Sequence, residues 1–274
     1  MDITGNAFVT GGGDGIGKAS CLVLAKEGAK GILVADINLK AAEETVAEAT
    51  AASTNPSFRA EAIYLDVSDE DSVKKAVARM VESFGRIDYC VHCAGTGITG
   101  SRPVDEAKFD DLKGSLAIHV HGTFLITSLV SAAMKKQDLA TVDSAHPERG
   151  GTRGSIVILG SYASLFPVRY MVPYTAAKHA VLAIAKTAAM ESAAHNVRVN
   201  CICPGWTDTP MLRHSMEVYE GMTADSLLET IPINRLCSSY DVADAALFFC
   251  SPRSSYVTGL AYLVDGGMAL TMKT

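Results

Sequence analysis

Tyr174 and Lys178 are the residues whose types and spacing most directly suggest chemistry. Residues four apart in a helix lie on the same face, so the lysine ammonium can approach the phenol. A phenol has a reference pKa of about 10 and is a poor base near neutrality, but a neighbouring positive charge favours its ionised form. Such a pair could take or return a proton at a substrate oxygen. The same spacing is also common on exposed helix faces that carry no function.

Ser161 directly follows the apolar run Ser155–Gly160, which predicts a buried strand. Tyr174 begins the predicted helix Tyr174–His195, just after Pro173. The end of a strand and the start of the next helix meet at the carboxyl edge of a parallel sheet, so both hydroxyl groups should lie there. Ser161 could then hydrogen-bond a substrate oxygen and hold it in line with the phenol.

A glycine-rich run, Thr10-Gly-Gly-Gly-Asp-Gly-Ile-Gly17, joins a predicted strand to a predicted helix. Glycines let the backbone turn sharply and approach a pyrophosphate, while the helix N-terminus points N–H groups at its charge. Alone, such a run indicates only a tight turn, but the strand before it and the helix after it favour a dinucleotide site. The expected cofactor contacts are Thr10, Gly11, Gly13, Asp14, Gly15, Ile16 and Gly17.

Asp36 ends the second predicted strand, about 20 residues beyond the glycine run. A carboxylate at this place accepts hydrogen bonds from the adenosine ribose hydroxyls and repels a 2′-phosphate. The following residues, Ile37 and Asn38, supply no cation for such a phosphate. The sequence therefore predicts NAD as the cofactor, with contacts at Asp36 and Ile37. Use of NADPH is the alternative.

Short apolar runs alternate with longer helical segments along the chain. The runs are continuously apolar, as expected of strands in a parallel sheet that helices cover on both faces. We therefore expect an α/β fold, a single Rossmann-like doubly wound domain over residues 1–274. The predicted strands are Asn6–Thr10, Gly31–Asp36, Ala62–Asp66, Ile87–Cys93, Ser155–Gly160, Val197–Cys203 and Ala261–Val264, and the predicted helices are Ile16–Glu27, Leu39–Ala52, Val73–Phe84, Phe109–Met134 (one or two helices), Tyr174–His195 and Val242–Cys250.

Two segments depart from this alternation. Residues 137–154 are polar, with two adjacent glycines, and are predicted to form a surface loop without a function of its own. Residues 208–232 are helical but follow a strand that ends at the carboxyl edge, so they are predicted to form a substrate lid over that edge.

Taken together, these motifs resemble the classical short-chain dehydrogenase/reductase family. The glycine run fits its TGxxxGxG pattern, Tyr174–Lys178 fits its YxxxK signature, and Ser161 is the serine that accompanies them. The resemblance runs from about residue 6 to residue 268 with its parts in order. It implies further cofactor contacts at Asp66 and Val67, at Cys93, Ala94 and Gly95, and at Pro204, Gly205, Thr207 and Thr209.

The resemblance implies an oxidoreductase that transfers hydride between NAD(H) and a secondary alcohol or ketone. Tyr174 would be the acid/base, Ser161 would hold the substrate oxygen, and Lys178 would assist the phenol and bind the nicotinamide ribose. The family's usual fourth catalytic residue, an asparagine, aligns with His119. A histidine there could hold a water molecule, shuttle protons near neutral pH, or be purely structural. Cys93 replaces a second family asparagine, with contacts expected mainly from its backbone.

The substrate is expected to be cyclic or hydrophobic, for example steroid-, terpenoid- or polyketide-like. Segment 162–171 and the lid would border it, and both are rich in apolar and flexible side chains. Arg169 could meet an anionic group, although a solvated arginine is the simpler interpretation. The expected substrate contacts are Ser161, Tyr162, Phe166, Arg169, Trp206 and Met211.

Other functions are compatible with the same motifs. The chain could be an NADPH-dependent ketoreductase of a biosynthetic pathway, an enzyme of epimerisation or dehydration, or a non-catalytic module that binds NAD. The resemblance also implies a homo-oligomer, a tetramer or a dimer, packed through the helices Phe109–Met134 and Tyr174–His195. An alanine-rich face of the second helix would permit close packing across a two-fold axis.

Composition limits the remaining classes. The 274 residues are 48% hydrophobic and carry a formal charge of −6, which argues against a nucleic-acid or anionic-membrane partner. We find no signal peptide and no stretch near the roughly 20 apolar residues that span a bilayer, so a cytoplasmic location is expected. The seven scattered cysteines are interpreted as buried thiols, and no metal site is expected.

Overall fold

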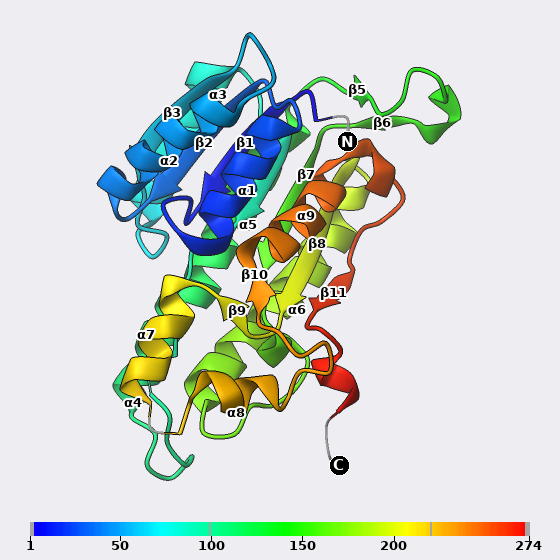
Figure 1. Ribbon diagram of the computed structural model, residues 1–274. Helices are drawn as coiled ribbons and strands as arrows, with labels where there is room; N and C mark the ends of the chain where they lie inside the picture. The colour runs from blue at the N-terminus through cyan, green and yellow to red at the C-terminus, as the bar shows by residue number, and fades with distance from the viewer. Residues whose placement is uncertain (1–2, 99, 220, 272–274) are drawn as a thin grey trace.

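Seven parallel strands form the central sheet of the computed structural model, which describes residues 3–98, 100–219 and 221–271 (Figure 1). The strand order is β11-β8-β7-β4-β1-β2-β3, so the chain runs outward from β1 and then returns to β4 on the other side of β1. Ligands bind at such a reversal, outside the carboxyl ends of the strands. The strands are β1 Asn6–Thr10, β2 Gly31–Asp36, β3 Arg59–Tyr64, β4 Tyr89–His92, β7 Gly154–Leu159, β8 Val197–Pro204 and β11 Ala261–Val264.

Helices cover both faces of this sheet, which confirms the predicted doubly wound fold (Figure 1). Successive side chains of a strand point to opposite faces, so Phe8 packs under one helical layer and Val9 under the other. Full burial of such a side chain contributes about 1.5–3 kcal/mol. One layer contains α1 Gly15–Lys26, α2 Leu39–Ala52 and α9 Ser239–Cys250, and the other contains α3 Glu70–Phe84, α5 Gly122–Lys135 and α6 Val172–Ala193.

The predicted helix over Phe109–Met134 is one continuous rod made of α4 Phe109–Ser115, the π-helical turn η1 Leu116–His121 and α5. An 18-residue window within Phe109–Lys135 has a mean hydropathy of 1.5, so the rod is long and apolar enough to cross a membrane by length and composition alone, contrary to the expectation that no such stretch exists. In the fold, Ile126, Val130 and Met134 of this rod are fully buried against the sheet. The rod therefore serves as a covering helix of the core.

Helix α6 begins two residues before the predicted start. Pro173 lies in its first turn, where a missing N–H costs nothing because the first helical N–H groups have no partner within the helix. Tyr174 therefore lies inside the first turn and not at its beginning. The other boundaries differ from prediction by a few residues, as for α9, which starts at Ser239 behind a capping box.

The segment 137–154 is a small hairpin and not an irregular loop. Strands β5 Ala140–Thr141 and β6 Gly151–Thr152 pair antiparallel, with the 3₁₀ turn η2 Pro147–Arg149 between them, and the hairpin projects from the body (Figure 1). The Arg149 guanidinium fastens its tip, because it donates to the carbonyl of Pro252 at 2.6 Å and to Ser255 Oγ at 3.0 Å.

The predicted lid segment lies beyond the carboxyl ends of the strands (Figure 1). It begins with β9 Thr207–Asp208, which pairs with β10 Cys237–Ser238. Two helices follow, α7 Pro210–Val218 and α8 Ala224–Leu228. The Tyr219 hydroxyl donates to the carbonyl of Ile98 at 2.5 Å, so the lid is tied to the loop that follows β4.

Candidate active site

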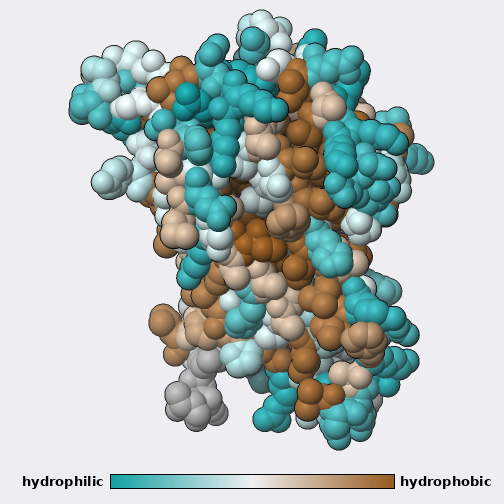
Figure 2. Space-filling model, turned by 180° about the vertical axis from the view of Figure 1, so that it is seen from behind, coloured by the Kyte–Doolittle hydropathy of each residue, from teal (hydrophilic) through white to brown (hydrophobic). Residues whose placement is uncertain are grey.

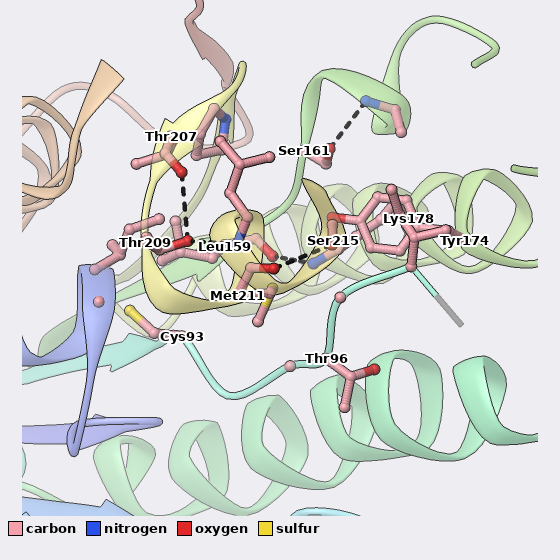
Figure 3. A pocket seen from close by; sticks show the side chains of 18 of the residues that line it. Cys93, Thr96, Leu159, Ser161, Tyr174, Lys178, Thr207, Thr209, Met211 and Ser215 are labelled. Carbon is pink, nitrogen blue, oxygen red and sulfur yellow. Dashed lines mark hydrogen bonds between the residues drawn. The ribbon is translucent and has the colours of Figure 1, made fainter. Parts of the chain in front are cut away.

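One cavity at the carboxyl edge brings the predicted chemical groups together. Ser161, Tyr174, Lys178 and His119 all line it, and so does the glycine-rich turn before α1 (Figure 3). These residues come from the end of β7, the start of α6, the π-helical turn and the end of β1. The cavity therefore lies where the strand order reverses, as the fold requires of a ligand site.

Lys178 lies one helical turn after Tyr174, and its ammonium is fixed in place. Its Nζ donates to the carbonyl oxygen of Leu159 at 3.0 Å and lies 5.7 Å from the centre of the Tyr174 ring. The lysine is 6% exposed, so its charge acts on the phenol through little water. Leu159 is the last residue of β7, which means that the sheet itself positions this ammonium.

The Ser161 side chain is held by the short 3₁₀ turn η3 Tyr162–Ser164, of which it is the N-cap. Its Oγ accepts the N–H of Ala163 at 3.1 Å, and the Oγ of Ser164 accepts the N–H of Ser161 at 3.1 Å. This capping box leaves the hydroxyl proton of Ser161 free to be donated into the cavity.

Gly160 precedes Ser161 at a place that leaves no room for a side chain. A Cβ there would lie 2.7 Å from Cys201 Sγ and 3.2 Å from Cys203 Sγ. The two buried thiols of β8 therefore occupy the space that a side chain at position 160 would need. Their sulfur atoms are 3.9 Å apart.

His119 is 2% exposed and stands against Tyr174, with the two ring centres 5.5 Å apart at 89°. Burial, and then the charge of Lys178, hold the pKa of its imidazole well below the usual value, so the ring is neutral near neutral pH. Its Nε2 is buried without a hydrogen-bond partner among the described residues. The hydroxyl oxygens of Thr96 and Thr175 are also buried without a hydrogen-bond partner among the described residues. His119 can therefore form a further hydrogen bond, but its ring carries no positive charge near neutral pH.

The glycine-rich turn is shaped by backbone contacts that exclude side chains. A Cβ on Gly17 would overlap the carbonyl oxygen of Gly11, and Gly11 itself has a φ of 64°. Asp14 is the N-cap of α1 and accepts the N–H of Gly15. Thr209 of the lid lies 3.2 Å from where a Cβ of Gly15 would be. The turn is therefore closely packed from both sides.

The Asp36 carboxylate lines the same cavity and is oriented by two backbone groups. Its Oδ2 accepts the N–H of Gly13 at 2.9 Å and its Oδ1 accepts the N–H of Asn38 at 2.8 Å. Each carboxylate oxygen can accept a second hydrogen bond. A pair of ribose hydroxyls would find free acceptors here.

The other predicted cofactor contacts divide into two groups. Asp66 lies outside the cavity wall, and its Oδ1 accepts hydrogen bonds from the N–H and the hydroxyl group of Ser68 at 2.9 and 2.7 Å. Cys93 lies in the cavity, and burial raises the pKa of its thiol to about 12, so the thiol stays protonated. The residues on the cavity wall are Gly11, Asp14, Gly15, Ile16, Gly17, Asp36, Cys93, Gly95, Pro204, Gly205, Thr207 and Thr209, and those outside it are Thr10, Gly13, Ile37, Asp66, Val67 and Ala94.

The predicted substrate contacts are brought together only in part. Tyr162, Trp206 and Met211 line the cavity. Phe166 stacks on Tyr162 with ring centres 4.8 Å apart and is outside the cavity wall. The exposed guanidinium of Arg169 lies 5.8 Å from the centre of the Tyr170 ring and is also outside the cavity wall.

Sequence reasoning missed several lining residues. Residues 96–98 follow β4, and the sequence signal that could have found them is their place directly after Cys93-Ala-Gly, at the carboxyl end of a strand. Ser215 and Met268 lie in elements that reach the cavity only through tertiary packing. Among the described residues no group of three histidine, cysteine or acidic side chains could hold a metal ion.

Comparisons with known proteins agree with this geometry. A family model described as enoyl-(acyl carrier protein) reductase matches residues 11–269. The short-chain dehydrogenase virB of Hypocrea virens is 47% identical over 272 residues, covering 99% of each chain. A 2,5-dichloro-2,5-cyclohexadiene-1,4-diol dehydrogenase of Sphingobium indicum is 35% identical over 268 residues, covering 97% of this chain and 98% of the relative.

Solved structures give the same result. Levodione reductase has a TM-score of 0.85 at 28% identity, covering 98% of this chain and 100% of that chain. A 3-ketoacyl-(acyl-carrier-protein) reductase from Brucella melitensis, complexed with NADH, has a TM-score of 0.81 at 27% identity, covering 97% and 99%. The family model, the relatives and the solved structures match nearly the whole length of this chain. The chain therefore belongs to the short-chain dehydrogenase/reductase family of oxidoreductases.

Proposed function

We propose that this oxidoreductase is NAD-dependent and interconverts a secondary alcohol and a ketone, with Tyr174 as the acid/base. The observation that carries the proposal is the meeting of Ser161, Tyr174 and Lys178 in the cavity that also contains the glycine-rich turn and Asp36. A proton-transfer group and a dinucleotide cradle in one cavity are what alcohol oxidation requires.

The residues present fit a nicotinamide dinucleotide. The glycine-rich turn is a cradle that side chains would fill, since a Cβ on Gly17 would overlap the Gly11 carbonyl. The turn opens onto the N-terminus of α1, which favours a pyrophosphate. Asp36 offers free carboxylate acceptors to ribose hydroxyls and no charge partner to a 2′-phosphate. Bound there, the cofactor would supply the acceptor or donor of hydride.

The chain's own groups would manage the proton. In the oxidative direction the Tyr174 oxygen takes the proton of the substrate hydroxyl, and in the reductive direction it returns a proton to the carbonyl oxygen. The Lys178 ammonium, fixed on the carbonyl of Leu159, stabilises the negative charge on the phenol oxygen. Ser161 donates its free hydroxyl proton to the substrate oxygen and holds it beside the phenol.

His119 is proposed as a neutral positioning residue for Tyr174. Its ring edge is packed at 89° to the phenol, and its Nε2 has no partner among the described residues. A buried polar group without a partner usually holds an ordered water molecule. Such a water would lie beside Tyr174 and Lys178 and could replenish their proton. The imidazole takes part as a hydrogen-bonding group, since its pKa is too low for it to be charged near neutrality.

The proposal includes a homo-oligomer, a tetramer or a dimer, formed through α5 and α6. A hydrophobic band runs down the molecule in the view of Figure 2. Phe124 on α5 and Met190 on α6 are more than half exposed. The alanines of α6 at positions 176, 180, 183 and 188 are exposed or half-buried. The seven free cysteines suit a reducing compartment such as the cytoplasm. Light scattering that gives the 28.9 kDa monomer would contradict the oligomer.

The test of the catalytic proposal is Tyr174→Phe, which keeps the ring and removes the acid/base. We expect turnover of cyclic secondary alcohols with NAD to fall by about 10²–10⁴-fold, the usual contribution of such a group. NAD binding should persist, measured by the fluorescence of Trp206, the chain's single tryptophan. Tyr240→Phe, on the exposed surface of α9, is the matched control and should leave turnover unchanged. Wild-type turnover in Tyr174→Phe would refute the assignment.

A further inference from the structure

Three methionines from distant parts of the chain line the same cavity. Met171 precedes α6, Met211 lies on α7, and Met268 begins the 3₁₀ turn η5 Met268–Leu270. All three line the cavity, together with the rings of Tyr162 and Trp206. Met171 and Met268 are 6% and 9% exposed, so their thioethers are enclosed by the fold and face little solvent.

Met211 is the most exposed of the three, but its position is set by the loop after β4. A Cβ on Gly97 would lie 3.1 Å from Met211 Cγ and 3.8 Å from its Sδ. The Met211 side chain therefore packs against the backbone of Gly97, where no side chain stands in the way. The Met211 side chain enters the cavity beside the residues that carry the proposed chemistry (Figure 3).

Among the described residues, no charged side chain lines the cavity without a partner. The charged residues on the cavity wall are Asp14, Asp36 and Lys178. The first two belong to the cofactor end, and the Lys178 ammonium is bound to the carbonyl of Leu159. Arg169 is outside the cavity wall. A carboxylate or phosphate on the substrate would therefore be buried beside the methionines without a cation, which is strongly unfavourable.

We propose that the three methionines form a subsite for an uncharged aromatic ring next to the carbon that is oxidised or reduced. This inference rests on the proposed function and names the substrate class of the same site. Thioether sulfur makes favourable contacts with aromatic ring edges that a saturated ring of the same size does not receive. Each such contact is worth roughly a 2- to 13-fold preference for the aromatic ring. Ketones that carry an uncharged aromatic ring close to the carbonyl carbon, and the corresponding alcohols, are therefore the preferred substrates.

The test compares 2-tetralone with 2-decalone, which share one fused-ring skeleton but differ in the aromaticity of one ring. Their dissociation constants are measured by Trp206 fluorescence on the enzyme loaded with oxidised NAD, which cannot reduce a ketone. We expect 2-tetralone to bind at least about 2-fold more tightly. A carboxylate derivative of 2-tetralone should bind more weakly than 2-tetralone itself.

Met211→Leu and Met268→Leu remove one sulfur each and keep volume and hydrophobicity, a kind of exchange that cores tolerate well. Each should lower the preference for 2-tetralone over 2-decalone. Met80→Leu is the matched control, because Met80 is buried on α3 and outside the cavity wall, and it should leave the preference unchanged.

The outcomes separate this inference from the proposed function. Equal binding of the two ketones, a preference that both cavity variants leave intact, or equal binding of the carboxylate derivative would overturn the ring subsite. Reduction of both ketones by NADH in that case would leave the oxidoreductase proposal standing. Preferential ring binding without turnover of any ketone or alcohol would support the subsite and count against the proposed function.

Discussion

Replacing Asp36 by alanine tests the cofactor preference most directly. Its carboxylate lines the cavity and is held by the N–H groups of Gly13 and Asn38 at 2.9 and 2.8 Å. No lysine or arginine forms an ion pair with it in the part of the chain that the structure describes. A 2′-phosphate placed against this group would meet an uncompensated negative charge. The alanine variant removes that charge and leaves two backbone N–H donors free.

The size of the effect follows from Coulomb's law. Two unit charges 4 Å apart interact by about 1 kcal/mol in water and about 4 kcal/mol at an effective dielectric constant of 20. A phosphate carries a charge of about −1.5 to −2, so its repulsion by Asp36 is at least about 1.5–2 kcal/mol, or roughly 10- to 30-fold in binding. Hydrogen bonds from ribose hydroxyls to a carboxylate are worth about 1.5–3 kcal/mol, so NAD should lose at least roughly 10-fold.

The assay is the ratio of kcat/KM for NAD to kcat/KM for NADP. We expect the wild type to prefer NAD, and Asp36→Ala to shift the ratio toward NADP by at least roughly 100-fold, the product of the two effects. Added salt should reduce the discrimination of the wild type, since the repulsion is screened. Glu43→Gln on α2 removes an exposed carboxylate outside the cavity and is the matched control. A wild type that prefers NADP, or a ratio unchanged in Asp36→Ala, would refute the reasoning.

Three further predictions concern the framework of the site. Gly17→Ala places a Cβ on the Gly11 carbonyl and should weaken NAD binding in fluorescence titration, and an unchanged Kd would contradict the packing argument. Burial, and then the charge of Lys178, lower the pKa of His92 to about 3, whereas the unfolded chain has a value near 6.5. Between these values the unfolded state binds more protons, so the free energy of unfolding should fall as pH falls from 6.5 toward 3. His92→Asn should flatten this dependence in urea melts, and an identical slope would refute the assignment. Arg149→Ala frees the tip of the 140–152 hairpin from Ser255 and should speed its proteolysis without changing kcat; slower turnover would give the hairpin a role in catalysis.

The sheet and its carboxyl edge could be predicted because their signals are local. A strand buried on both faces must be apolar at every position, so runs such as Gly31–Asp36 are visible in the sequence. The pairing of Tyr174 with Lys178 needs only a helix, and the glycine-rich turn needs only the strand before it and the helix after it. These features were placed correctly because each depends on residues close together in the chain.

The hairpin at 140–152 could not be predicted for the opposite reason. Its strands are only two residues long, which is too short to carry a periodic pattern. The contact that fixes it joins Arg149 to Pro252, more than a hundred residues away.

The same distinction explains why the chemistry of this site is easier to predict than its substrate. The proton-handling groups are fixed by short-range geometry: Lys178 by one helical turn and the end of β7, and Ser161 by its own capping box. The methionines of the proposed ring subsite, Met171, Met211 and Met268, line the cavity only after the lid and the C-terminal turn have packed onto the sheet. The hydrogen bonds that position Lys178 and Ser161 involve none of these methionines. The substrate of this enzyme must therefore be inferred from the cavity, and not from the motifs.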